Sequence, residues 1–253
     1  MTRIETFRAL HIPGDPLVLF NIWDAGSAKT VAAAGAKAIA TGSYGVACAR
    51  GSSDGENLSL DAALANLGEI LGVTDLPVSI DMEAGYGANA VAVGRSVARA
   101  RQAGAAGINM EDRMPGETAL LALGDAAARI EAAAASGLFV NARCDVFRGR
   151  DAAADGDALI AATLERARAY AGAGAGGLFV PFLADARCIA AICDASPLPV
   201  NILWSNPCGD RAALAALGVA RISHGGEPWR AAMAWLGEQA TVVLGGGVPG
   251  YAA

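Results

Sequence analysis

Eight short apolar segments recur along the chain, and stretches with helical spacing separate them. Neighbouring strands of a parallel sheet need helical crossovers and must be covered on both faces, so this alternation favours an all-parallel sheet. Eight such units close a barrel. We therefore predict an α/β fold, a parallel (β/α)8 TIM barrel with peripheral helices, as a single domain over residues 1–253. The predicted strands cover residues 17–22, 38–40, 78–80, 107–110, 138–141, 178–180, 200–203 and 220–223.

The predicted helices lie between these strands. An open, doubly wound sheet is the alternative, but no GxGxxG motif follows the first strand, and polar residues stand at nearly every strand end rather than at one switch point. No segment long enough to be a linker interrupts the pattern. The expected helices span residues 26–35, 60–71, 89–103, 125–135, 157–171, 184–193 and 228–236.

Polar side chains follow almost every predicted strand. In a barrel of this kind the carboxyl ends of the strands form the mouth of the active site. Residues scattered along the sequence are therefore expected to converge on one pocket. These residues are Asn21, Ser43, Asp81, Glu83, Glu111, Arg143, Asn201 and His224.

Two carboxylates close the third strand. Asp81 and Glu83 are two residues apart, so on an extended strand they point to the same side and repel each other. A divalent cation would relieve this repulsion, and hard oxygen ligands suit Mg²⁺ or Mn²⁺. The alternative is that the acids cap the next helix or pair with Arg95 or Arg99.

Arg143 follows the fifth strand and would face the carboxylates of strands three and four. Its guanidinium can hold a carboxylate in bidentate fashion, while a metal withdraws electrons from a carbonyl or enolate oxygen. The alternative role of Arg143 is an ion pair with Asp145 or Glu111. A further oxyanion could be held by backbone N–H groups, since glycine permits close approach, around Ser43, Tyr44 and Gly45.

Composition limits the partners. The net charge of -6 and the pI near 4.9 leave no basic stripe for a nucleic acid. The N-terminal residues lack the apolar core of a signal peptide and no membrane span is evident, so a cytoplasmic location is expected. The five cysteines are odd in number and form no CxxC pair, which favours reduced thiols.

Several short motifs occur in a fixed order along the chain. They are residues 21–27 (NIWDAGS), 43–45 (SYG), 81–87 (DMEAGYG), 109–112 (NMED), 141–145 (NARCD) and 179–181 (FVP). As an ordered set they resemble the isocitrate lyase/phosphoenolpyruvate mutase superfamily.

That resemblance implies a barrel enzyme that binds Mg²⁺ and a 2-oxo or 2-hydroxy acid, and that makes or breaks a C–C or P–C bond through an enolpyruvate-like oxyanion. It also implies a homo-oligomer, a dimer or a tetramer built as a dimer of dimers, in which the eighth helix often packs on a neighbouring subunit. Implied metal ligands, direct or through water, are Asp81, Glu83 and Glu111. Implied substrate contacts are Trp23, Ser43, Tyr44, Gly45, Asp54, Arg143 and Asn201.

The loop after the fourth strand departs from the family pattern. Isocitrate and methylisocitrate lyases carry a cysteine-containing segment there, and phosphoenolpyruvate mutases carry a lysine. Here residues 113–120 read RMPGETAL, without cysteine, lysine or histidine. Cys144 is no replacement, because strand alternation points it away from the side of Arg143.

A decarboxylase needs only to hold and protonate an enolate, which suits such a loop. His224 at the end of the eighth strand is a candidate proton donor, although a packed histidine is the alternative, and Tyr44 could serve instead. We therefore expect a Mg²⁺-dependent lyase or decarboxylase acting on a small oxo acid such as oxaloacetate. A phosphonate P–C mutase or hydrolase and a non-catalytic oxo-acid-binding paralogue remain as alternatives.

Overall fold

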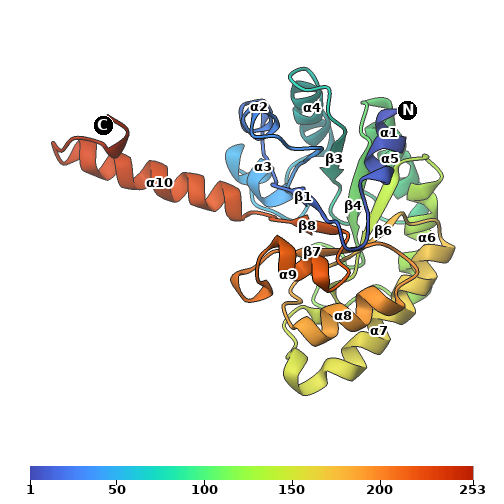
Figure 1. The fold of residues 1–253 in the computed structure, drawn as a ribbon. Coiled ribbons are helices and arrows are strands. Elements are labelled where there is room, and N and C mark those ends of the chain that lie inside the picture. The colour runs from blue at the N-terminus through green and yellow to red at the C-terminus, as the bar shows by residue number, and fades with distance from the viewer. Residues whose placement is uncertain (253) are drawn as a thin grey trace.

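The computed structural model describes residues 1–252, and its centre is a sheet of eight parallel strands (Figure 1). Neighbouring strands follow the order β1-β8-β7-β6-β5-β4-β3-β2. The remaining gap between β1 and β2 is bridged where the Ile22 N–H donates to the Ala40 carbonyl at 2.9 Å, so the sheet closes nearly completely. The strands are β1 (Leu17–Leu19), β2 (Ile39–Ala40), β3 (Val78–Asp81), β4 (Gly107–Glu111), β5 (Phe139–Arg143), β6 (Gly177–Val180), β7 (Val200–Leu203) and β8 (Arg221–Ser223).

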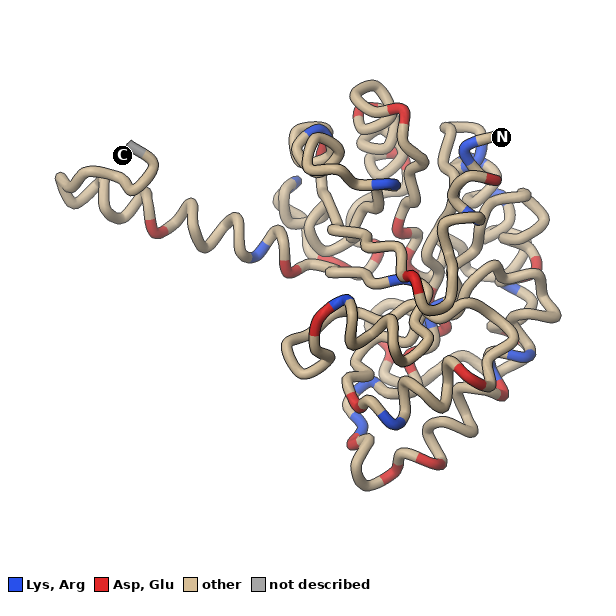
Figure 2. Tube along the Cα trace, viewed as in Figure 1, with Lys and Arg blue, Asp and Glu red and all other residues tan. Residues whose placement is uncertain are grey.

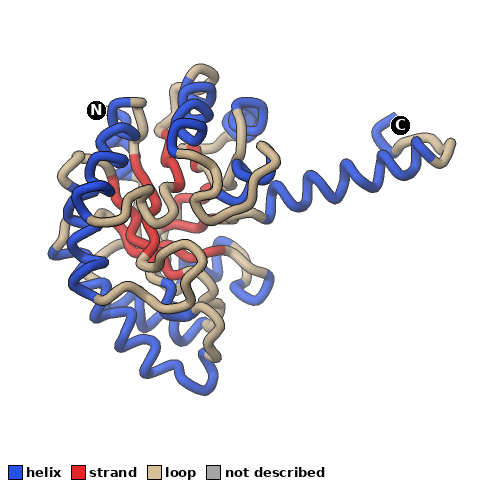
Figure 3. The backbone as a smooth tube through the Cα atoms, turned by 180° about the vertical axis from the view of Figure 1, so that it is seen from behind, coloured by secondary structure: helices blue, strands red, loops and turns tan. Residues whose placement is uncertain are grey.

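Helices surround the strands on the outside of the barrel (Figure 3). Most were predicted within a few residues, and α4 has the predicted bounds, but α1, α3 and α9 were not predicted. The helices are α1 (Arg3–Ala9), α2 (Ala25–Ala33), α3 (Ser43–Ala49), α4 (Leu60–Leu71), α5 (Ala90–Gln102), α6 (Leu123–Ala134), α7 (Ala152–Gly172), α8 (Ala186–Ala195), α9 (Arg211–Ala216) and α10 (Glu227–Leu244), with 3₁₀ turns η1 (Asp145–Phe147), η2 (Asn206–Cys208) and η3 (Gly250–Ala252).

Local sequence accounts for where the helices begin. Asp24 caps α2 by accepting a hydrogen bond from the Ser27 N–H, and Ser59, Asn89 and Asp185 cap α4, α5 and α8 in the same way. The strands are buried on both faces, as β6 illustrates by being buried at every position. The α/β barrel predicted from the alternation is confirmed.

The amino-terminal end of the barrel is closed by α1. Phe7 of this helix is fully buried against Phe139, with ring centroids 5.4 Å apart in an edge-to-face arrangement. Gly107 lets the Phe7 ring approach the barrel wall, because a Cβ at that position would lie 2.7 Å from the ring. The opposite end of the barrel is therefore the open one.

The last helix, α10, extends beyond the predicted 228–236 and projects away from the barrel (Figure 1). Within the helix only Pro228 is buried, whereas Trp235, Leu236 and Leu244 are exposed. Figure 2 shows few charged residues along it. Among the described residues, no helix has both the length and the apolar character needed to cross a membrane.

Candidate active site

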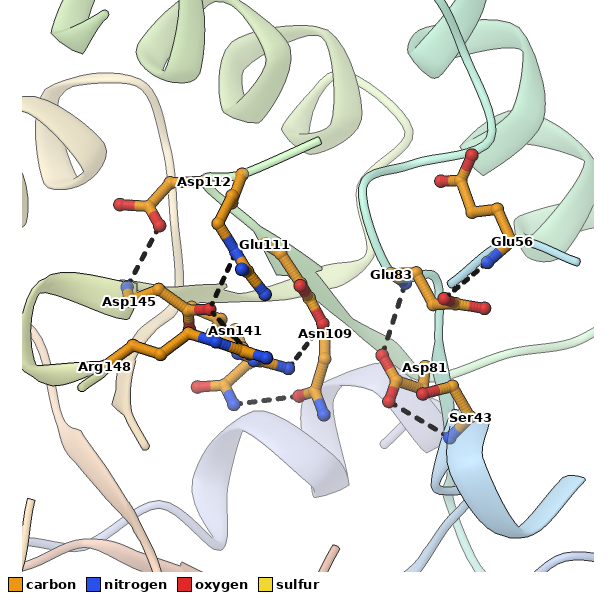
Figure 4. Close-up of polar contacts among 12 residues, drawn as sticks. Ser43, Glu56, Asp81, Glu83, Asn109, Glu111, Asp112, Asn141, Asp145 and Arg148 are labelled. Carbon is orange, nitrogen blue, oxygen red and sulfur yellow. Dashed lines mark hydrogen bonds and ion pairs between the residues drawn. The ribbon is translucent and has the colours of Figure 1, made fainter. Parts of the chain in front are cut away.

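The predicted acidic residues lie together at the open end of the barrel (Figure 4). Asp81 ends β3 and Glu111 ends β4, and the Glu111 N–H donates to the Glu83 carbonyl at 2.7 Å. Glu83 has a φ of 48°, a conformation that bulky residues seldom adopt. At this turn the Glu83 N–H donates to Asp81 Oδ1 at 3.3 Å, so three acids from two neighbouring strands lie close together.

Nearby N–H and O–H groups hold these carboxylates in place. Asp81 Oδ2 accepts from the Ser43 N–H at 3.2 Å. Glu83 Oε2 accepts from the Glu56 N–H at 2.6 Å, and Glu83 Oε1 accepts from the Tyr86 hydroxyl at 3.2 Å. The acids are therefore oriented by donors from three separate segments rather than by helix capping or by Arg95 and Arg99.

Burial makes this cluster electrostatically costly. Burial, together with the charges of Asp81 and Asp54, raises the pKa of Glu83 to about 8. Burial raises the pKa of Glu111 to about 7 despite the opposing effect of Arg143, and it also raises the pKa of Asp81. A cation placed among these groups would be attracted by all three carboxylates.

The donor set fits a hard cation held partly through water. In the described part of the chain, no three histidine, cysteine or acidic side chains are close enough to form a ready-made metal cluster. Mg²⁺ characteristically keeps several waters and uses one or two carboxylates directly. Asp81, Glu83 and Glu111, whose pKa values are raised, supply only oxygen donors, which match that requirement.

Arg143 lies on the opposite side of the same space. Its Nε and Nη2 donate to Asp145 at 2.6 and 3.0 Å, and its Nη1 donates to Glu111. Both ion pairs that the sequence suggested as an alternative are thus formed. Glu83, Glu111 and Arg143 line a cavity of about 380 Å³, which Asp54 also borders, whereas Asp81 lies next to Glu83 and does not line it.

Asp145 is held in turn by Asp112. The Asp145 N–H donates to Asp112 Oδ1 at 3.0 Å, and Asp112 Oδ2 accepts from Tyr170 and Arg166 at 2.7 and 3.1 Å. Asp112 is 3% exposed and does not line the cavity. It fixes the start of η1, and with it the carboxylate that orients Arg143.

The Ser43–Gly45 segment begins α3 rather than forming an open loop. Ser43 lies next to Asp81, but the Tyr44 ring packs edge-to-face on Trp229 at 5.7 Å, beneath the guanidinium of Arg230. Gly45 fits closely between Trp23 and Trp229. Tyr44 and Gly45 therefore connect the site to α10, and they do not line the 380 Å³ cavity.

Two other predicted residues are engaged elsewhere. The His224 ring stacks on Trp204 at 5.5 Å and lies 5.2 Å from Phe20, and burial lowers its pKa. Asn201 is buried inside the barrel, where its amide donates to the Ser223 hydroxyl at 3.0 Å. The structure thus places neither side chain on the cavity. His224 adopts the packed arrangement that the sequence left as the alternative.

Sequence reasoning missed four residues of the site. Glu56 and Tyr86 hold Glu83, and Glu56 Oε1 also accepts from the Tyr86 N–H at 2.8 Å. Arg113 and Arg148 line the cavity beside Arg143. Tyr86 lies within the motif at residues 81–87, and Arg113 begins the loop at residues 113–120; the loop positions of Glu56 and Arg148 carried no signal. Cys144 is buried in the core, as strand alternation predicted.

Comparisons with known proteins identify the family of this chain. Residues 7–244 match the family model of phosphoenolpyruvate phosphomutase. A solved structure from Burkholderia cenocepacia J2315, named provisionally as a phosphonomutase, superposes with a TM-score of 0.91 at 46% identity, covering 97% of this chain and 98% of that one. An uncharacterised protein of Mycobacterium tuberculosis is 39% identical over 236 residues, 90% of this chain and 84% of its own length.

Relatives with named activities are more distant. Escherichia coli 2-methylisocitrate lyase is 31% identical over 207 residues, 78% of this chain and 68% of its own length. Paraburkholderia xenovorans oxaloacetate decarboxylase is 35% identical over 138 residues, 51% of this chain and 44% of its own. Phosphonopyruvate hydrolase, solved with oxalate and Mg²⁺, has a TM-score of 0.84 at 25% identity, covering 98% of this chain and 89% of that one. The chain therefore belongs to the phosphoenolpyruvate mutase/isocitrate lyase superfamily, as the ordered motifs predicted.

Proposed function

We propose that this protein is a Mg²⁺-dependent lyase or decarboxylase that acts on a small 2-oxo or 2-hydroxy acid through an enolpyruvate-type oxyanion. The observation that carries the proposal is the division of one cavity into two walls. Glu83 and Glu111, with Asp81 next to them, form an acidic wall, and Arg143 with Arg113 and Arg148 forms a cationic one. A small dianion fits between a cation held by the first wall and the second wall.

Asp81, Glu83 and Glu111 would hold Mg²⁺, directly or through water. When bound, the cation would stabilise negative charge developing on the substrate's carbonyl oxygen. The phosphonopyruvate hydrolase solved with oxalate and Mg²⁺ supports this assignment, because oxalate resembles an enolpyruvate oxyanion. Mn²⁺ has the same preference for oxygen ligands.

The protein's own groups would bind and orient the substrate. Ser43 lies beside the acidic wall, and Asp54 borders the cavity from the loop after α3. A decarboxylase is favoured over a C–C lyase with a protein acid, because the loop at residues 113–120 holds no cysteine, lysine or histidine. Oxaloacetate is the first substrate to test, and the partial match to oxaloacetate decarboxylase points to the same compound.

A phosphonate-processing activity is the second candidate. Arg113 and Arg148 add two guanidinium groups to the cavity besides Arg143, which suits a doubly charged phosphonate. Release of phosphate from phosphonopyruvate, without CO₂ release from oxaloacetate, would favour this candidate over the first.

We further propose that the protein is a homo-oligomer in which α10 packs on a second copy. In a barrel, the helix after β8 normally covers β8 and β1, but α10 projects away from them (Figure 1). The barrel surface there has an apolar hollow of about 580 Å³. Residues of β1 and α2, and residues directly after these elements, line it, among them Val18, Phe20, Val31 and Ala34. An exposed apolar helix and an uncovered apolar hollow on one chain complement each other between two copies.

Calorimetric titration of oxalate, with and without Mg²⁺, tests the proposed function. Binding that requires Mg²⁺ is expected, followed by CO₂ release when oxo acids are screened. Tight Mg²⁺-dependent binding without turnover of any oxo acid or phosphonate would instead indicate the non-catalytic paralogue. Absence of oxalate binding under both conditions would refute the proposed site.

A further inference from the structure

Three guanidinium groups surround one buried carboxylate at the cationic wall. Asp145, whose side chain is fully buried, receives the two hydrogen bonds from Arg143. Asp145 Oδ2 also lies 3.4 Å from Arg113 Nε and 3.5 Å from Arg148 Nη1. Among the described residues, the one other carboxylate paired with these arginines is Glu111. Three positive charges therefore face two negative ones, which leaves a positive excess beside the cavity.

The three arginines differ in how many of their donors are already used. Arg143 is engaged through Nε, Nη1 and Nη2, all by Asp145 and Glu111. Arg113 is 14% exposed in its side chain and donates from Nη1 to the Glu117 carbonyl at 2.8 Å, so its guanidinium is tied to its own loop. Arg143 cannot turn to a ligand without giving up these contacts, and Arg113, although its Nη2 makes no hydrogen bond to a described residue, is largely buried and held by its Nη1.

Arg148 is the most exposed of the three guanidinium groups. Its side chain is 45% exposed, and its Nη1 approaches Asp145 only at 3.5 Å, without a hydrogen bond of the side chain to any described residue. The guanidinium lies 5.1 Å from the centre of the Phe182 ring, and Arg148 lines the same cavity as Glu83 and Glu111. Figure 4 shows it beside Asp145, across the cavity from Asp81 and Glu83.

Phe182 supports this arrangement. It has a φ of 65°, an unusual value for an aromatic residue, and it is 49% exposed. Its ring lies under both Arg148 and Arg143, whose guanidinium is 5.8 Å from the ring centre. A strained backbone that keeps an aromatic ring in solvent beside two arginines indicates a constraint at a ligand site rather than core packing.

We propose that Arg148 captures the distal anionic group of the substrate, at the end away from the 2-oxo acid moiety, and so selects substrates that carry such a group. The family resemblance assigns Arg143 to that end. In this arrangement Arg143 stays in its ion pairs and contributes through its positive charge. A guanidinium with free donors binds a carboxylate or a phosphonate in bidentate fashion. This inference rests on the proposed function, since it takes the acidic wall as the place of the 2-oxo acid moiety.

The test compares three ligands that differ only at the distal carbon. Lactate has no distal anion, malate has a carboxylate, and 3-phosphonolactate has a phosphonate; oxalate reports on the acidic wall alone. Their dissociation constants are measured with Mg²⁺, by competition against oxalate, for the wild type, Arg148→Gln and Arg150→Gln. Arg150 is a matched control, because it is similarly exposed but pairs with Asp155 at 3.0 Å outside the cavity.

Arg148→Gln is expected to raise the dissociation constant of malate or 3-phosphonolactate about 10- to 100-fold, which corresponds to the loss of a charge-assisted hydrogen-bond pair. The dissociation constants of oxalate and lactate should not change. The distal ligand that loses more identifies the group the site prefers. Arg150→Gln should change none of the four. An unchanged preference for malate and 3-phosphonolactate over lactate in Arg148→Gln would overturn the inference, as would an equal loss of oxalate. Failure of oxalate to bind the wild type would instead refute the proposed function, and the inference with it.

Discussion

In the metal-free protein, the charge of Glu83 in the acidic wall should lower the free energy of unfolding. We consider Glu83→Gln, which keeps the size of the side chain and removes its charge. Burial and the neighbouring acids raise the pKa of Glu83 from 4.5 to about 8, and each unit corresponds to about 1.4 kcal/mol. Ionised Glu83 therefore costs the folded state about 5 kcal/mol above pH 8.

The sign follows from the direction of the shift. Because the pKa is raised on folding, the contribution of Glu83 to stability is fully present below pH 4.5 and is lost as pH rises through about 8. Glutamine cannot ionise and avoids this loss. It can accept from only one of the two donors that Glu83 uses, the Glu56 N–H and the Tyr86 hydroxyl, and leaving the other unpaired costs about 1–3 kcal/mol.

We therefore expect Glu83→Gln to be more stable than the wild type by about 2–4 kcal/mol at pH 9, and to lie within about 1 kcal/mol of it at pH 6. Urea unfolding in EDTA, followed by circular dichroism at both pH values, measures the difference. The same variant should lose Mg²⁺-dependent oxalate binding. A stability difference that is the same at pH 6 and pH 9 would show that Glu83 has no raised pKa, and the electrostatic argument for the site would fail.

Three further changes test other parts of the molecule. Asp81→Ala should abolish Mg²⁺-dependent oxalate binding and leave the circular dichroism spectrum unchanged; loss of folded protein would make Asp81 structural. Trp235→Ser on α10 should shift the oligomer toward monomer in light scattering at micromolar concentration, whereas an unchanged mass would remove this face from the interface. Gly107→Ala should lower the free energy of unfolding by about 1–3 kcal/mol, because its Cβ would lie 2.7 Å from Phe7; an unchanged melting temperature would contradict that packing.

The barrel could be predicted because its strands are buried on both faces. The segment at residues 177–180 is short, apolar throughout and preceded by glycine. Such a segment is typical of a parallel strand that is covered on both faces. The short helix α3 could not be predicted in the same way, since it contains a glycine and two alanines and follows a strand directly. Its helical state depends on Gly45 fitting between two tryptophans that are distant in sequence.

The location of the acidic residues could be predicted because position in the barrel alone determines it. Residues at the ends of β3 and β4 must face the barrel mouth, so the acidic wall followed from sequence. Position at a strand end does not determine the partner of a side chain, however. His224 has Trp204 and Phe20 as neighbours, and Tyr44 has Trp229, and these contacts form only in the folded chain.

The two walls of the cavity carry opposite charges, and different kinds of groups hold them in position. Asp81 and Glu83 are held by N–H and O–H donors from Ser43, Glu56 and Tyr86, none of which neutralises them, so their charge remains available to a cation, whereas Glu111 is paired with Arg143. The cationic wall is held by Asp145, which Asp112 anchors, and it retains a positive excess. Each wall is thus fixed in position but incompletely neutralised. A cation and a dianion that bind together would complete the charge balance of both walls, so their binding should be mutually dependent.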